Sequence, residues 1–210
     1  TLREHYKSIG RYNAKVDPIV TTLPNNRAEI TLQIDEDDTA KLRSVTFNGN
    51  EAISSSKLQE QMELQPDSWW KLWGNKFDGS QFDKDIQAIQ DYYQNNGYAK
   101  ARVTKTDVQL NEEHTKADVT IDVSEGEKYN LSSARIVGNL GGMADELQPL
   151  LGELHLNDTF SRADVQNVES LIKDKLGERG YGSATVNTVP TFDDANKTLA
   201  LTFVVDAGRR

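Results

Sequence analysis

Asn96-Gly97-Tyr98-Ala99-Lys100-Ala101-Arg102-Val103 is the middle member of a segment that occurs three times in the 210 residues of this chain. The same order of Gly, Tyr, small residues and Val recurs at residues 9–16 and 179–186. The tyrosines of the three copies are 86 and 83 residues apart. Because a repeat of this length is a domain rather than one turn of a solenoid, we expect a row of similar small domains.

Two further elements recur at a similar spacing. The strand end at residues 45–50 matches residues 134–139, and a closing strand recurs at residues 30–34, 119–123 and 199–205. We therefore expect the C-terminal part of one domain, a helix end and two strands, at residues 1–38. Complete domains are expected at residues 41–128 and 131–210.

Each complete copy reads as strand, helix, helix, strand, strand. In the middle copy, residues 42–47, 99–110 and 117–123 are extended runs. The first helix is expected to begin at Ser54 or Ser55, and the second at Ser80, with Asp83 and Asp85 in its first turn. Apolar residues recur at helical spacing in the second helix of both copies: Phe82, Ile86, Ile89 and Tyr93, then Val165, Val168, Ile172 and Leu176.

This order of elements predicts the fold class. In the last strand, Leu199, Leu201, Phe203 and Val205 alternate onto one face. Two helices that must cover one face of a sheet give a two-layer domain. The prediction is α+β, with tandem β-α-α-β-β domains, each a three-stranded mixed sheet covered by two helices.

The composition excludes several kinds of function. The net charge is −9, so nucleic acid is a poor partner, because phosphate binding needs a basic face. Cysteine is absent, which removes thiol nucleophiles and thiolate metal sites. No apolar run approaches the ~18–20 residues of a membrane helix, so no direct bilayer insertion is expected. Because the chain starts at Thr1 and stops just after a strand-like run, we interpret it as a piece of a longer protein.

The second strand of each unit is expected at a sheet edge. Pro18 and Pro190 occupy it in the first and last copies, and proline lacks the N–H that a central strand donates. The middle copy has no proline there, so its edge is open to an added strand. Its apolar residues change from odd to even positions, which predicts a bulge between residues 103 and 108 that turns Val108 and Leu110 away from the core. The alternative is a bent edge strand that faces only solvent.

Few residues suggest chemistry. His5, His114 and His155 lack metal-ligand spacing, and no motif places a pair of carboxylates. No catalytic residue, metal site or cofactor is therefore expected. The loop with Trp69, Trp70 and Trp73 is interpreted first as a cap over a small core. A partner contact is the alternative, because tryptophan is enriched at interface anchors.

These features resemble a known family. The order of elements, the Gly-Asn end of the first strand and the Gly-Tyr helix stop are similar to those of POTRA domains. The runs at residues 23–27, 69–70 and 204–208 resemble those of the outer-membrane protein assembly factors of Gram-negative bacteria. The resemblance covers essentially the whole chain. It corresponds to the end of the second POTRA domain and to the third and fourth, with a membrane barrel expected elsewhere in the full-length protein.

The resemblance implies a periplasmic scaffold within an outer-membrane protein. Such a scaffold docks accessory lipoproteins, BamB most directly, and guides unfolded outer-membrane proteins by β-augmentation. The docking edge of the family corresponds to Thr104, Val108 and Leu110, with Leu64 as a further contact; Thr104 departs from the acidic residue expected there. Alternatives are the POTRA array of another outer-membrane transporter, TamA-like or for two-partner secretion, and a periplasmic metal-binding or hydrolytic domain.

Overall fold

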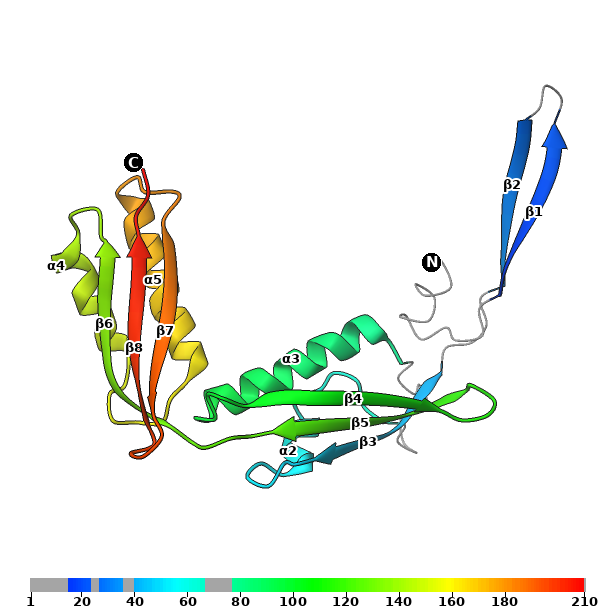
Figure 1. Ribbon diagram of the computed structural model, residues 1–210, viewed down its shortest axis with the longest axis horizontal. Helices are drawn as coiled ribbons and strands as arrows, with labels where there is room; N and C mark the ends of the chain where they lie inside the picture. Colours follow the sequence, from blue (N-terminus) through cyan, green and yellow to red (C-terminus); the bar gives the residue numbers. More distant parts are fainter. Residues whose placement is uncertain (1–14, 24–26, 36–39, 67–76, 210) are drawn as a thin grey trace. The chain divides into compact units, whose positions relative to one another are not determined.

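The computed structural model describes residues 15–23, 27–35, 40–66 and 77–209 (Figure 1). The chain divides into two compact units. The first unit contains Thr1–Gln90 and Arg102–Ser124, and the second contains Asp91–Ala101 and Glu125–Arg210. Each unit holds one three-stranded sheet, and strands β1 (Lys15–Leu23) and β2 (Arg27–Asp35) pair as a separate antiparallel hairpin.

The first sheet has the strand order β3-β5-β4. Strands β3 (Lys41–Asn48) and β5 (Lys116–Ser124) are parallel, and β4 (Arg102–Leu110) is antiparallel to β5. Every second residue of β5 is buried: Ala117, Val119, Ile121 and Val123. Helices α2 (Ser55–Gln59) and α3 (Gly79–Asn95) also bury apolar side chains, among them Leu58, Phe82 and Ile89. The sheet therefore has one face in the core and one open face.

The second sheet repeats this plan with the order β6-β8-β7. Strand β6 (Asn130–Asn139) is parallel to β8 (Thr198–Asp206), and β7 (Thr185–Asp193) is antiparallel to β8. Figure 1 shows α5 (Arg162–Glu178) behind this sheet. The core contains the residues predicted from the two apolar patterns: Val165, Val168, Ile172 and Leu176 of α5, and Leu199, Leu201, Phe203 and Val205 of β8.

The helix ends refine the sequence prediction. Asp78, rather than Ser80, caps α3, because its Oδ1 accepts the N–H groups of Ser80 and Gln81 at 2.8 and 3.3 Å. The first helix of the second unit is only α4 (Ala144–Leu147), followed by the 3-10 turn η1 (Gln148–Glu153). Pro149 lacks an N–H to continue the α-helical pattern there.

The recurring Gly-Tyr segment ends both long helices, α3 and α5. The N–H of Tyr98 donates to the carbonyl of Tyr93 at 3.0 Å, and the N–H of Tyr181 donates to the carbonyl of Leu176 at 3.1 Å. The predicted α+β class with tandem mixed sheets is confirmed. Within the described ranges, no helix has the length and apolar character needed to span a bilayer.

Candidate partner-binding edge

Strand β4 lies at the edge of the first sheet, as predicted. It pairs with β5, and the described residues contain no strand on its other side. In an antiparallel pair, alternate N–H and C=O groups of each strand point away from the partner. Strand β4 therefore presents a row of backbone donors and acceptors to its surroundings.

The predicted bulge is present in β4. The pairing register with β5 shifts between Val103 and Lys105, so that Thr104 is the extra residue. The hydroxyl of Thr104 donates to the carbonyl oxygen of Asp122 at 3.1 Å. At the start of the strand, the N–H of Val103 donates to the side-chain oxygen of Gln90 at 3.4 Å. The open stretch of the edge therefore runs over residues 104–110.

The bulge has the opposite effect on side-chain direction from the one predicted. Val108 lies opposite Val119, and Leu110 lies opposite Ala117, both of which are buried residues of the core face. Directly opposed residues share a face, so Val108 and Leu110 point to the core side and are half-buried. The prediction that they turn away was wrong: the extra residue at position 104 returns the later apolar residues to the same face as Val103.

The other face of β4 carries polar side chains. Lys105, Asp107 and Gln109 lie opposite Asp122, Thr120 and Asp118 on the open face of the sheet. The amide of Gln109 donates to Asp107 Oδ2 at 2.9 Å. A strand added to β4 would thus meet polar side chains on one face and the exposed parts of Val108 and Leu110 on the other.

The structure does not place Leu64 or the three tryptophans on the edge strand. Leu64 is 5% exposed, so its side chain belongs to the core, and it could contact a partner only if it left that position. Trp69, Trp70 and Trp73 lie outside the described residues. The structure thus brings Thr104, Val108 and Leu110 together on one strand and places Leu64 in the interior.

A buried carboxylate fixes the backbone at Leu64. Asp85 of α3 is 2% exposed, and its two oxygens accept the N–H groups of Glu63 and Leu64 at 2.9 and 3.0 Å. The amide of Gln81 also donates to it, at 3.1 Å. Asp83 and Asp85 both lie beyond the first turn of α3, so the prediction that places them in that turn was wrong. The signal that could have revealed the role of Asp85 is its position three residues after Phe82, on the buried stripe of the helix.

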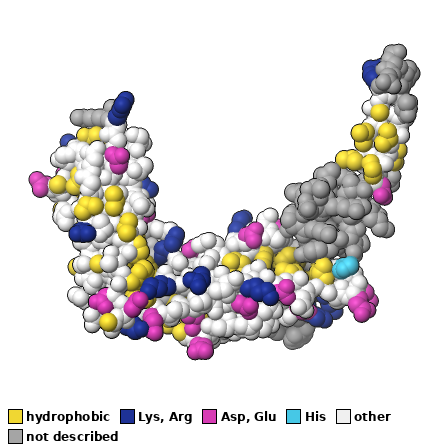
Figure 2. Space-filling view, viewed as in Figure 1, with side chains coloured by type: hydrophobic (Ala, Val, Ile, Leu, Met, Phe, Trp, Pro, Cys, Tyr) yellow, Lys and Arg dark blue, Asp and Glu magenta, His cyan; other side chains and the backbone are white. Residues whose placement is uncertain are grey.

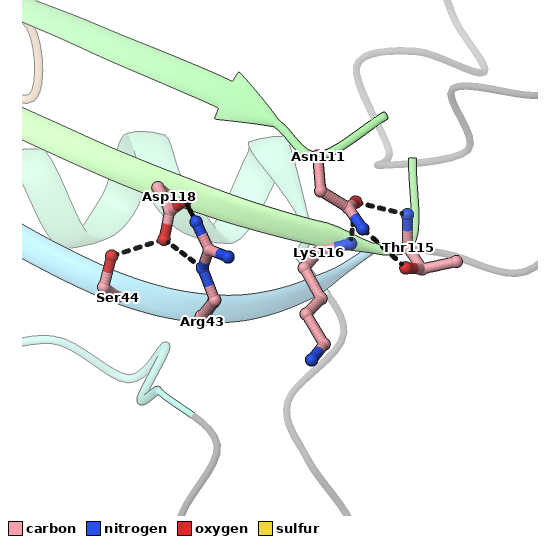
Figure 3. A network of polar contacts seen from close by, with 6 residues as sticks. All are labelled: Arg43, Ser44, Asn111, Thr115, Lys116 and Asp118. Atoms are coloured by element: carbon pink, nitrogen blue, oxygen red, sulfur yellow. Dashed lines mark hydrogen bonds and ion pairs between the residues drawn. The ribbon is translucent and has the colours of Figure 1, made fainter. Parts of the chain in front are cut away.

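Two polar clusters lie beside the strands of this sheet (Figure 3). Asn111 closes the β4–β5 hairpin, because its side-chain oxygen accepts the N–H groups of Thr115 and Lys116 at 2.9 and 2.8 Å. Arg43 pairs with Asp118 through two nitrogens, and Ser44 also donates to Asp118. The hydrogen bonds from Arg43 and Ser44 hold the pKa of Asp118 below its ordinary value.

The edge strand of the second sheet has no bulge, and it carries a proline where β4 carries a valine. Val103 and Val186 lie opposite Val123 and Val205, respectively. In β5, Val119 precedes Val123 by four residues and lies opposite Val108. In β8, Leu201 precedes Val205 by four residues and lies opposite Pro190. Pro190 therefore occupies in β7 the place that Val108 occupies in β4. Its ring removes a backbone donor from the β7 edge, whereas β4 keeps that donor.

The side chains of the described ranges form no group of three His, Cys, Asp or Glu residues that could hold a metal ion. The arrangement at β4 is suited to backbone pairing with another chain. Its main features are an unpaired strand edge, flanking half-buried apolar side chains and a polar open face.

Comparison with known proteins gives a family match over most of the chain. The family model POTRA, described as surface antigen variable number repeat, matches residues 40–126 and 129–208. The outer membrane protein assembly factor BamA of Neisseria meningitidis is 32% identical over 213 residues, covering 100% of this chain and 26% of that protein. BamA of Buchnera aphidicola is 28% identical over 212 residues, covering 100% of this chain and 34% of that protein.

A solved structure agrees with these matches. The crystal structure of Haemophilus influenzae BamA POTRA3-5 is 75% identical in sequence, with a TM-score of 0.75, and covers 81% of this chain and 67% of that one. The chain spans about a quarter to a third of the length of the two curated relatives.

Proposed function

The chain belongs to the POTRA family, and we propose that it is a periplasmic scaffold of the machinery that assembles outer-membrane proteins. On this proposal, the chain docks an accessory lipoprotein, BamB or a relative of it, and guides unfolded outer-membrane proteins by β-augmentation. Its work is binding rather than catalysis. The identity of 75% to the POTRA3-5 structure supports assigning residues 41–128 and 131–210 to the third and fourth domains. We propose that residues 1–38, which precede them, are the end of the second.

The open edge of β4 is the observation that carries this proposal. An added strand gains affinity from main-chain hydrogen bonds and therefore places few demands on sequence. Such a mode suits a scaffold that receives many different chains. The bulge at Thr104 and the hairpin turn at Asn111 delimit the accepting stretch.

Val108 and Leu110 contribute to docking through their exposed parts. Side chains of an added strand that face the helix side would lie beside these two residues, as neighbours across a strand pair do. Because both residues are also part of the core face, a charged substitution there would disturb folding as well as binding. A test of the edge therefore needs a substitution that changes the backbone donor.

Val108→Pro is that substitution, because Pro190 shows that the fold accepts proline at this register position. Purified BamB from the same organism is titrated by calorimetry into the whole 210-residue chain. The proline removes one main-chain donor and places its ring in the path of an added strand. We expect affinity to fall about ten- to hundredfold relative to wild type.

Val108→Ala and Pro190→Val are the controls. The first keeps the N–H and is expected to bind within about threefold of wild type. The second alters the β7 edge alone and is expected to leave BamB binding unchanged. Normal BamB binding by a folded Val108→Pro chain would refute the β4 assignment. If Val108→Pro fails to fold, protection of the β4 amides of the wild-type chain on binding decides the question.

A further inference from the structure

The open faces of the two sheets differ sharply although their strands pair in the same way. In the first sheet, three cross-strand rows face outward: Asn48-Asp122-Lys105, Thr46-Thr120-Asp107 and Ser44-Asp118-Gln109. The equivalent rows of the second sheet are Val137-Val204-Asn187, Arg135-Thr202-Val189 and Ser133-Ala200-Thr191. The first face carries four charged residues and no apolar one, and the second carries one charged residue and four apolar ones.

The apolar residues of the second face are exposed. Val137, Val189 and Val204 are 36, 44 and 40% exposed, and Figure 2 shows hydrophobic side chains grouped over this sheet. Where the first sheet joins Asn48 to Asp122 by a hydrogen bond of 2.8 Å, the second sheet has Val137 beside Val204. We name Val137, Val189, Val204 and Arg135 the valine face. In a domain of the same plan the same rows are polar, so folding does not require valine at these positions.

Arg135 gives the valine face a charge preference. Its Nε donates to the hydroxyl of Thr202 at 3.0 Å, which holds the guanidinium at the middle strand β8, in the row that also contains Val189. No carboxylate lies in the three rows. A guanidinium in an apolar setting is a strong site for a carboxylate of a bound chain.

We propose that the valine face binds an extended segment of an outer-membrane protein client that carries apolar side chains at alternate positions around a carboxylate. The identity of this occupant rests on the proposed function. Strands of outer-membrane proteins alternate apolar and polar residues. Their alternate side chains are spaced about 6.6–6.8 Å apart, which is also the spacing between successive rows on one face of a sheet. The apolar side of such a segment matches the valines, and its carboxylate matches Arg135.

The test uses three synthetic peptides of about ten residues, the length of a membrane strand. Each alternates valine with threonine and carries Glu, Gln or Lys at one central valine position. Each is titrated into the 15N-labelled whole chain, and amide shifts are followed by NMR. We expect the Glu peptide to shift amides of β6, β8 and β7. It should bind about tenfold more tightly than the Gln peptide, and the Lys peptide should bind most weakly.

The double variant Val137→Asn/Val204→Asp transplants the Asn48-Asp122 pair of the first sheet into the second. We expect it to weaken binding of the Glu peptide about tenfold or more. Arg135→Gln should remove the preference for Glu over Gln. Equal affinity of all three peptides, or shifts that avoid the second sheet, would overturn the proposal. The peptide series on the wild-type chain decides the matter even if a variant does not fold.

The Val108→Pro chain separates this inference from the proposed function. On the second sheet it should bind the Glu peptide as wild type does, while its affinity for BamB falls about ten- to hundredfold. If the peptide instead shifts β4 and is lost with Val108→Pro, the valine face is refuted and the edge function stands. Suppose that Val108→Pro leaves the affinity for BamB unchanged, while the valine-face variants weaken peptide binding. The proposed function of the β4 edge is then wrong, and the valine face remains a binding surface.

Discussion

Replacing Gly138 by alanine is expected to lower the free energy of unfolding of the second unit by about 3 kcal/mol, because two costs add. Gly138 has φ +104°, a conformation that L residues rarely adopt. A Cβ there would lie 2.2 Å from the carbonyl oxygen of Val205, in the neighbouring strand β8. For a domain of this size, the melting temperature should fall by about 12–24 °C in a thermal unfolding experiment followed by circular dichroism.

Two other glycines of the same unit separate these costs. Gly142 has φ +78° but nothing within 4 Å of an added Cβ, so Gly142→Ala should cost about 1 kcal/mol from backbone strain alone. Gly177 lies in α5 with open space around it, so Gly177→Ala should stabilise by about 0.5–1 kcal/mol. If Gly138→Ala costs no more than Gly142→Ala, the close approach to Val205 is not a real constraint.

Asp85→Ala is expected to lower the free energy of unfolding by about 3 kcal/mol, with the effect confined to the first unit. The substitution removes the carboxylate acceptor of the Leu64 N–H in a buried place, and that of the Glu63 N–H in a half-buried one. Such a group costs about 1–3 kcal/mol when it has no partner. Denaturant unfolding of the two chains measures the difference, and Asp85→Asn, which keeps one acceptor oxygen, should fall between them.

Asp83→Ala is the matched control for Asp85. It removes the same side chain from the same helix, two positions away, at an exposed site. We expect its effect to stay within about 0.5 kcal/mol. Comparable losses for Asp83→Ala and Asp85→Ala would show that the buried hydrogen bonds do not anchor residues 63–64.

The elements and the edge could be predicted from sequence because their signals are local. The absence of an N–H in Pro190 is a property of one residue, and β7 indeed lies at an edge. The alternation of Leu199, Leu201, Phe203 and Val205 needs only the period of a strand, and all four are buried. The switch of apolar residues from odd to even positions in β4 likewise predicted the bulge that the structure has at Thr104.

The direction of Val108 and Leu110 could not be predicted in the same way. The switch of apolar residues from odd to even positions shows that the strand has an irregularity. Only the register with β5 shows which side chains then face the core. The hydrogen bonds of Asp85 join residues 21 and 22 positions apart, and no periodic pattern connects them. The contrast between the two open faces also depends on register, because it compares rows of three strands.

Hydrogen exchange of the β4 amides, measured by NMR on the wild-type chain with and without BamB, tests the open edge most directly. Alternate N–H groups over residues 104–110 should exchange rapidly in the free chain, because β5 leaves them unbonded, and should become protected on binding. The amides of β7 should stay unchanged. Full protection of residues 104–110 in the free chain, or binding of BamB without any gain of protection there, would contradict the account.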